Sequence, residues 1–212
     1  MKEDILEQLT EDYLNHYGYF TMTNVKYRPP KDDPDYNSRQ DSVASDIDVL
    51  AVHPTKSGIN KVIAVTCKSW QSGFWPEVEI RSMMKTVSGR VGWKRYRELW
   101  MPIWSRAFQA KVAAFTGTDS FIHLTTVTMV GDLKAQAKGK SPDTSAWESC
   151  PRFRDNLPGC QFRVLALQDM VGALQSELTT TVANSSLSRT LQLMKTIGVE
   201  LRRMPPPTWL TA

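Results

Sequence analysis

The sequence predicts an α/β protein with a mixed central sheet flanked by helices. Two observations predict this class. Short runs of β-branched and aromatic residues alternate with segments of helical periodicity, in the expected order α-β-β-β-α-(α)-β-(loop)-β-α-α. The chain has 212 residues, of which 41% are hydrophobic and 23% charged, so it is long and apolar enough to bury a core.

The first elements follow from hydrophobic spacing and turn residues. Residues 3–17 carry apolar side chains at helical spacing and are followed by Gly18, so we expect a helix there. Residues 19–27 predict a strand, and residues 28–41, with three prolines and four aspartates, predict a long loop. Two buried strands joined by a turn follow and predict a hairpin, at residues 47–53 and 61–67.

The second half is expected to add helices and two more strands. Pro76 opens a helix that we expect to continue to about Leu99, and Pro102 begins another helical segment. The later elements are a strand at 122–130, a loop at 138–160, a strand at 162–167 and helices at 168–178 and 187–197. We therefore expect residues 1–130 to form the core domain and residues 131–212 to be an extension packed on the same domain.

Charge is distributed unevenly along the chain. Residues 1–48 hold 5 Lys and Arg against 11 Asp and Glu, a net of −6, which leaves +10 on the other 164 residues. The segment from Arg81 to Lys111 contains eight basic side chains and one acid, Glu98. An acidic end beside a basic middle suits a metal site next to a polyanion. The alternative is that the basic run is a solvated helix face.

Composition also limits where the protein works. No apolar run approaches the roughly 18–20 residues that cross a bilayer, so we expect no membrane partner. The acidic start MKEDILEQLTED lacks the basic and apolar segments of a signal peptide. Three cysteines cannot all pair, which fits a reducing, cytoplasmic location.

The sharpest pair of candidate residues lies in the expected hairpin. Asp48 opens the strand in SDIDVLAV, and Lys68 closes the next strand in VIAVTCKSW. The two ends of a tight hairpin lie side by side, so the carboxylate and the ammonium group are expected to meet. Carboxylates suit Mg²⁺, and a neighbouring lysine can orient water and offset charge on a phosphate. The alternative is a simple surface ion pair between Asp48 and Lys68.

This hairpin resembles the PD-(D/E)xK nuclease superfamily, which includes restriction endonucleases, Mrr-like enzymes and archaeal Holliday-junction resolvases. The resemblance covers roughly residues 3–130. It implies a restriction-endonuclease-like αβββαβ core that cleaves DNA phosphodiesters with Mg²⁺ or Mn²⁺. Asp48 matches the first aspartate of the motif and Lys68 matches its lysine. The acidic motif position two residues before the lysine is Thr66 here.

The resemblance implies that a helix supplies the missing carboxylate. Glu79 or Glu77, in PEVEI, stands in the following helix, and Glu7 stands in the first helix with Glu11 one turn on. Each of these acids has an ordinary alternative, as a solvated helix acid or one favoured by the helix dipole. The expected catalytic set is Asp48, Lys68, Glu7, Thr66 and Glu79, with Asp48, Glu7 and Glu79 holding the metal and Asp46 a less favoured ligand.

Basic and aromatic residues near this set are candidates for nucleic-acid contact. They are Arg81, Lys85, Arg90, Lys94 and Arg95 in the basic segment, Trp70 after the hairpin, and Lys26 and Arg28 beside the acidic loop. Other residues are expected in the core. Cys67 faces away from Thr66 and Lys68, and the spacing of Trp93, Tyr96, Trp100 and Trp104 favours a buried helical stripe over stacking on bases.

Three hypotheses about function follow. The first is a metal-dependent nuclease acting on DNA, in defence against phage or in DNA repair, as a homodimer or within a larger complex. The second is a nuclease-derived DNA-binding module that has lost cleavage, which would agree with Thr66. The third is a protein-interaction or assembly domain, in which the acidic N-terminal part meets a basic partner.

Overall fold

A five-stranded sheet organises the chain, in the order β1-β2-β3-β6-β7. The computed structural model describes residues 4–69, 73–87, 90–132, 143–177, 185–199 and 205–211. Strands β1, β2 and β3 are antiparallel, whereas β3, β6 and β7 are parallel, so the predicted α/β class with a mixed sheet is confirmed. The strands are β1 (Phe20–Tyr27), β2 (Ser45–Val52), β3 (Val62–Lys68), β6 (Ile122–Val127) and β7 (Gln161–Ala166).

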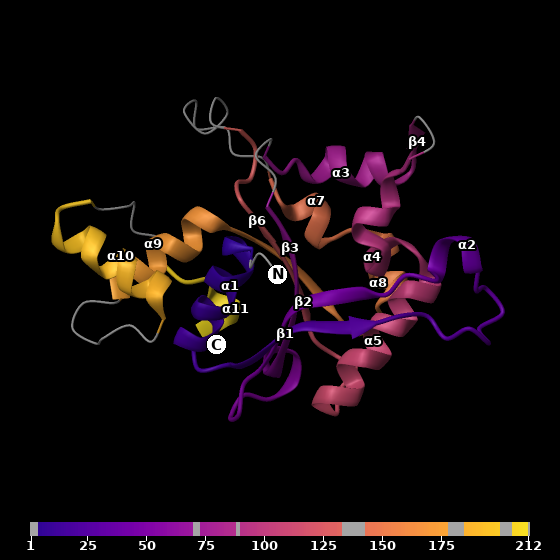
Figure 1. Ribbon diagram of the computed structural model, residues 1–212, viewed down its shortest axis with the longest axis horizontal. Helices are drawn as coiled ribbons and strands as arrows, with labels where there is room; N and C mark the ends of the chain where they lie inside the picture. The colour runs from indigo at the N-terminus through magenta and orange to yellow at the C-terminus, as the bar shows by residue number, and fades with distance from the viewer. Residues whose placement is uncertain are drawn as a thin grey trace.

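Two layers of helices cover the sheet (Figure 1). One layer holds α1 (Ile5–His16), α9 (Leu167–Glu177), α10 (Ser186–Thr196) and α11 (Thr208–Thr211). The other holds α3 (Pro76–Met83), α4 (Arg97–Trp100), α5 (Pro102–Thr116), α7 (Ser145–Glu148) and α8 (Pro151–Asn156). Each layer buries its own set of apolar side chains against one face of the sheet.

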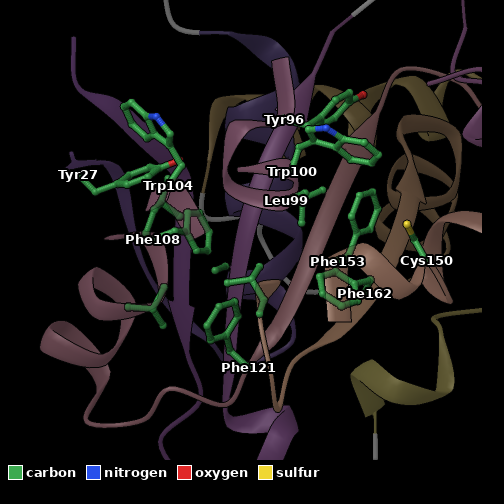
Figure 2. Packing of buried hydrophobic residues seen from close by; sticks show 14 of the residues in the cluster. Tyr27, Tyr96, Leu99, Trp100, Trp104, Phe108, Phe121, Cys150, Phe153 and Phe162 are labelled. Carbon is green, nitrogen blue, oxygen red and sulfur yellow. The ribbon is translucent and has the colours of Figure 1, made fainter. Parts of the chain in front are cut away.

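We call these two sets the α5-side core and the α1-side core. The α5-side core is rich in aromatic rings (Figure 2), and several of them pack edge to face. Its members include Tyr27, Tyr96, Trp104, Phe108, Trp147 and Phe153. The α1-side core is largely aliphatic, with Leu9, Leu14, Val49, Val65, Leu124 and Met170 among its members.

Helix α1 is fixed at both ends. The Asp4 side chain caps its start by accepting a hydrogen bond from the Leu6 amide at 2.8 Å, and Ser69, just past β3, donates to the same carboxylate at 2.7 Å. Near its end, His16 and Tyr17 both bond the Glu177 carboxylate of α9. Ser69, after β3, and Glu177, on α9, therefore hold the two ends of α1 in place.

The expectation of one helix from Pro76 to about Leu99 is wrong. Helix α3 ends at Met83 and is followed by a small hairpin of β4 (Thr86–Val87) and β5 (Arg90–Val91), then by a 3-10 turn, η2 (Gly92–Tyr96), and α4. A Cβ on Gly92 would lie 2.0 Å from the Ser82 carbonyl oxygen, so the backbone doubles back closely on α3. This tertiary contact overrides the helical spacing of the aromatic residues.

Two further expectations are corrected or refined. The segment 138–160, expected as a loop, contains α7 and α8, because Trp147 and Phe153 bury their rings in the α5-side core. The expected stripe of Trp93, Tyr96, Trp100 and Trp104 does pack inward, although it spans η2, α4 and α5. A short helix, α2 (Ser38–Asp41), interrupts the long loop after β1.

In the described part of the chain, no helix combines the length and apolar character that crossing a membrane requires.

Candidate active site at the ends of strands β2 and β3

Asp48 and Lys68 lie toward the same end of the sheet, as the hairpin predicts, although β2 begins at Ser45 and Asp48 is its fourth residue rather than its first. The Asp48 carboxylate accepts a hydrogen bond of 2.5 Å from the backbone N–H of Cys67, the residue before Lys68. The Lys68 ammonium group stands over the ring of Tyr96, 5.3 Å from its centroid. The sheet therefore fixes Asp48 through the backbone of β3, and Tyr96 supports the lysine from the helical layer.

The strand alternation changes at Asp48. Ile47 belongs to the α5-side core, yet Val49, two residues on, belongs to the α1-side core. The facing residue on β1 is Asn24, which lies between the pairs Thr23↔Val49 and Val25↔Ile47 and has φ 55°. Asparagine tolerates this left-handed conformation better than most residues do. Such local irregularities in a strand often re-aim a side chain next to a functional site.

The environment of Asp48 favours its protonated form. The pKa of Asp48 is raised to about 7, mainly by burial, and the negative charges of Glu7 and Asp46 contribute to this rise. The Cys67 N–H and the Lys68 charge act in the opposite direction but do not compensate fully. A strongly perturbed carboxyl group with a specific charged neighbour is typical of functional sites.

Glu7 approaches the same site from α1. Burial raises the pKa of the Glu7 carboxyl, and the negative charges of Asp4 and Asp46 add to this shift, while Lys68 opposes it. The α1 cap on Asp4 and its bond to Ser69 place the first turn of the helix beside the end of β3. Glu11, one turn further on, instead accepts a hydrogen bond from Thr21 on β1.

Glu79 has a different partner. Its carboxylate lies 3.2 Å from the Arg95 guanidinium group, and burial raises its pKa while Arg95 lowers it. Glu77 lies exposed in the first turn of α3. Of the helix acids considered from the sequence, Glu7 is thus the one whose charge acts on Asp48.

Thr66 faces the α5-side core and contacts a buried carboxylate. Its hydroxyl donates to Glu98 of α4 at 3.1 Å and lies 3.5 Å from Nε2 of His123 on β6. Burial raises the pKa of Glu98, and the positive charge of Lys68 is the largest influence against that rise. Burial lowers the pKa of His123 to about 3, so this imidazole is neutral near pH 7.

The sequence reasoning missed the role of Glu98. It counted this residue only as the one acid of the basic segment. A usable signal was present, since Glu98 stands between apolar positions of the aromatic stripe, and an acid there must be buried with a partner. Thr66, the residue that departs from the nuclease motif, is that partner.

Cys67 points away from these residues, as expected. Its sulfur lies 3.0 Å from the Thr126 hydroxyl and 3.9 Å from that of Thr10, on the α1 side of the sheet. Burial raises the pKa of this thiol far above its usual value, and the Asp48 charge adds to the rise. A thiol in such surroundings is unreactive at neutral pH.

The residues expected to contact nucleic acid differ in their surroundings: some form ion pairs and others are exposed. Lys26 forms an ion pair of 2.6 Å with Asp46, and Arg95 is engaged by Glu79. Trp70 lies outside the described residues, as does the side chain of Arg90. The remaining candidates have exposed side chains, namely Arg28, Arg81, Lys85 and Lys94.

Asp48 and Glu7 are the oxygen donors that this site offers to a hard cation. The negative charge of Glu7 raises the pKa of Asp48, so the two carboxylates interact near the end of β3. Carboxylate oxygens are ligands that suit Mg²⁺ or Mn²⁺. Within residues 4–69, 73–87, 90–132 and the later described ranges, no three His, Cys, Asp or Glu side chains form a group that could hold a metal ion. Mg²⁺ is commonly bound by one or two carboxylates with water and substrate phosphate, so two suffice chemically.

Comparison with known proteins gives no match for this chain, either to a family model, to a curated protein or to a solved structure.

Proposed function

We propose that this protein is a metal-dependent nuclease that hydrolyses DNA phosphodiesters. The observation that carries the proposal is the convergence of Asp48, Glu7 and Lys68 at one end of the sheet, with the pKa of Asp48 raised to about 7. The antiparallel strands β1–β3 followed by parallel β6 also agree with the PD-(D/E)xK resemblance. We propose a cytoplasmic role in defence against foreign DNA or in DNA repair.

Asp48 and Glu7 are the proposed ligands of Mg²⁺ or Mn²⁺. In the described part of the chain neither carboxylate forms an ion pair with Lys or Arg, so a divalent cation would offset a real electrostatic deficit. The bound cation would polarise a phosphate oxygen and lower the pKa of a coordinated water. Glu79 is a weaker candidate because Arg95 already balances its charge.

Lys68 is the proposed partner of the attacking water. Its ammonium group lies near Asp48 and acts electrostatically on Glu7, Asp48, Glu98 and His123. A cation at this point can orient the water and offset the charge that develops on the phosphate. Thr66 contributes no ligand in this scheme, because its hydroxyl is bonded to Glu98. In this scheme Thr66 has a structural role, because its hydrogen bond to Glu98 links β3 to α4.

The decisive experiment is cleavage of supercoiled plasmid and of single-stranded DNA with Mg²⁺ or Mn²⁺. We expect nicking by the wild type and its loss in the variants D48A and K68A. Glu7→Gln is also expected to lose activity by at least about 100-fold, because it removes one metal-binding charge. Glu11→Gln is the matched control, since Glu11 lies one turn away on α1 and bonds Thr21.

Thermal unfolding with added metal is a second test, which measures cation binding and does not depend on cleavage activity. Mg²⁺ or Mn²⁺ should raise the melting temperature of the wild type and of Glu11→Gln, but not that of Asp48→Asn. Nicking that persists in D48A and K68A would refute the assignment of this site.

One observation favours a second candidate function. Because Thr66 replaces an acidic motif residue and is bonded to Glu98, the site has one carboxylate fewer than the family pattern implies. A nuclease-like module that binds DNA without cleaving it would have this arrangement. Salt-sensitive DNA binding with no cleavage in either metal would support that candidate over the nuclease.

A further inference from the structure

A groove of about 490 Å³ lies beside the edge strand, between the end of β1 and helix α5. Among the described residues that line it, three carry cationic side chains and none carries an acidic one, and small residues of α5 form part of its wall. The cations are Lys26, Arg28 and Lys111, and the small residues are Ala107, Ala110 and Ala114.

The spacing along α5 explains how the groove is formed. Ala107, Ala110, Lys111 and Ala114 stand at positions i, i+3, i+4 and i+7, so they share one face of the helix. Alanine leaves the helix backbone open to close approach, and Lys111 adds a positive charge to the same face. This side chain also stands over the ring of Phe115, with its ammonium group 5.6 Å from the ring centroid.

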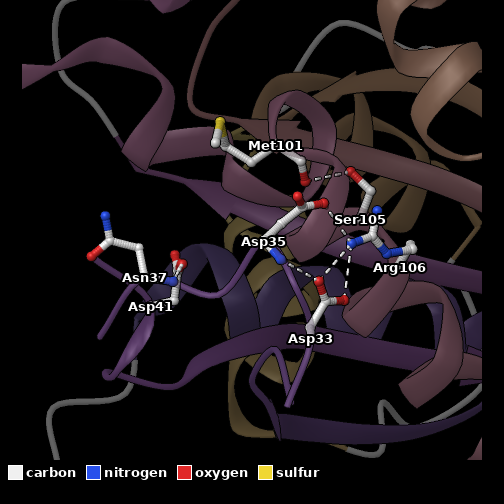
Figure 3. Close-up of polar contacts among 7 residues, drawn as sticks. All are labelled: Asp33, Asp35, Asn37, Asp41, Met101, Ser105 and Arg106. Atoms are coloured by element: carbon white, nitrogen blue, oxygen red, sulfur yellow. Dashed lines mark hydrogen bonds and ion pairs between the residues drawn. The ribbon is translucent and has the colours of Figure 1, made fainter. Parts of the chain in front are cut away.

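The acidic loop beside the groove is already engaged (Figure 3). Arg106 of α5 binds Asp33 at 2.9 and 3.0 Å and Asp35 at 3.2 Å. Asp41 accepts a hydrogen bond of 2.7 Å from the indole N–H of Trp104. These bonds fix the loop to α5 and direct the carboxylates of Asp33, Asp35 and Asp41 to protein partners rather than to the groove cations.

Two groove cations therefore remain available for a ligand. Lys26 is paired with Asp46, but in the described parts of the chain neither Arg28 nor Lys111 forms an ion pair with a carboxylate. Arg28 follows β1 and Lys111 belongs to α5, so the two positive charges reach the groove from different elements and complement an elongated anion better than a single small one.

A pair of charged residues lies between the groove and the site at Asp48. Lys26 lines the groove, its partner Asp46 lies opposite it on β2, and the charge of Asp46 acts on both Glu7 and Asp48. An anionic chain lying in the groove would thus lead toward the proposed metal ligands.

We propose that this groove binds the sugar–phosphate backbone of a DNA strand next to the phosphate being hydrolysed, with Arg28 and Lys111 each contacting a phosphate group. The proposal rests on the function proposed above and adds how the substrate is held. Because the contacts are to the backbone, they carry no base sequence information.

The test is DNA binding in EDTA, where cleavage cannot occur, measured by fluorescence anisotropy of labelled duplex and single strands at several salt concentrations. The variant is Arg28→Glu with Lys111→Glu. The matched control is Lys61→Glu with Arg189→Glu, which makes the same change in net charge at the opposite hairpin end and on α10. Arg28→Gln with Lys111→Gln is a milder variant that serves if charge reversal impairs folding.

We expect the groove variant to bind duplex DNA about tenfold or more weakly than the control. The slope of log affinity against log salt should become shallower by about 2, since each lost phosphate contact contributes roughly 0.9. Equal binding by the groove variant and the control would overturn the proposal. Competition by poly-glutamate as effective as by DNA would also overturn it, in favour of an acidic protein partner.

The groove proposal and the nuclease proposal can fail separately. Metal-dependent nicking that needs Asp48, together with unchanged binding by the groove variant, would overturn the groove proposal alone. Absence of nicking, together with weakened binding by the groove variant, would overturn the nuclease proposal and support the groove as the binding surface of an inactive module.

Discussion

At the scale of single residues, two carboxylic acids, Asp48 and Glu98, are largely buried. Asp48 lies in β2 near the acids Glu7 and Asp46, and Glu98 is buried against Thr66 and His123. Both have raised pKa values, and burial is the largest cause in each case. Yet their partners differ, so replacing them should have opposite effects on stability.

Replacing Asp48 by Asn should stabilise the protein in EDTA at pH 8. Because the folded pKa is about 7 and that of a free aspartate is near 4, the folded state binds more protons between these values. The free energy of unfolding of the wild type should therefore fall as the pH rises from 4 to 7. Asn still accepts the Cys67 N–H bond without ionising, so we expect a gain of about 1–3 kcal/mol at pH 8.

Urea unfolding at pH 5 and pH 8 checks this expectation. The difference in stability between Asp48→Asn and the wild type should be small at pH 5 and larger at pH 8. A difference that does not change with pH would contradict the raised pKa.

Replacing Glu98 by Ala should destabilise the protein by about 2–4 kcal/mol, because it leaves the buried Thr66 hydroxyl without its acceptor and opens a cavity. Glu98→Gln keeps an acceptor oxygen and the side-chain volume, so its cost should stay below about 1 kcal/mol. Thermal unfolding of the two variants tests the contrast. Equal losses would mean that the charge of Glu98, rather than its bond to Thr66, is what the fold requires.

At the scale of elements, the main feature is the break in side-chain alternation along β2 beside Asp48, opposite Asn24 on β1. Ile47 and Val49, two residues apart on β2, contribute to different cores, and Asn24 on β1 adopts a positive φ at the facing position. The hydrophobic pattern alone predicted both strands with nearly correct bounds. It could not predict the change of face, because that depends on how the two strands pair and not on either one.

Asn24→Val should cost about 1–2 kcal/mol, since a β-branched side chain strongly disfavours the left-handed conformation. Asn24→Gly should be nearly neutral. Thr23→Val is the matched control, because Thr23 is exposed on the same strand and paired regularly with Val49, where valine is favourable. Chemical denaturation of the three variants gives the comparison. Similar losses for Asn24→Val and Thr23→Val would show that the backbone at Asn24 is not strained.

At the scale of the whole molecule, the sequence predicted the sheet better than it predicted the helical layer on the α5 side. The strands carry local signals, namely β-branched runs bounded by turn residues, and the order of elements follows from them. The break after Met83 depends on Gly92 approaching Ser82, and α7 forms around the burial of Trp147. Such contacts join distant parts of the chain, so no local window of sequence contains them.

The candidate site shows the same division. Asp48 and Lys68 were predictable because one hairpin brings them together. Glu7 required the family resemblance, which supplied the first helix as a source of carboxylate. The motif could not predict the contact between Glu98 and Thr66, because it forms only when α4 packs against the sheet.

The clasp between α1 and α9 has a consequence for the order in which the molecule is made. Glu177 bonds His16 and Tyr17, and Met170 packs in the same core as Leu9. Asp48 and Lys68 are synthesised long before α9. The nascent chain would therefore contain the β2–β3 hairpin before Glu177 can bond His16 and Tyr17 and hold α1, the helix that carries Glu7. The proposed metal site would therefore lack a firmly held Glu7 until α9 had emerged from the ribosome.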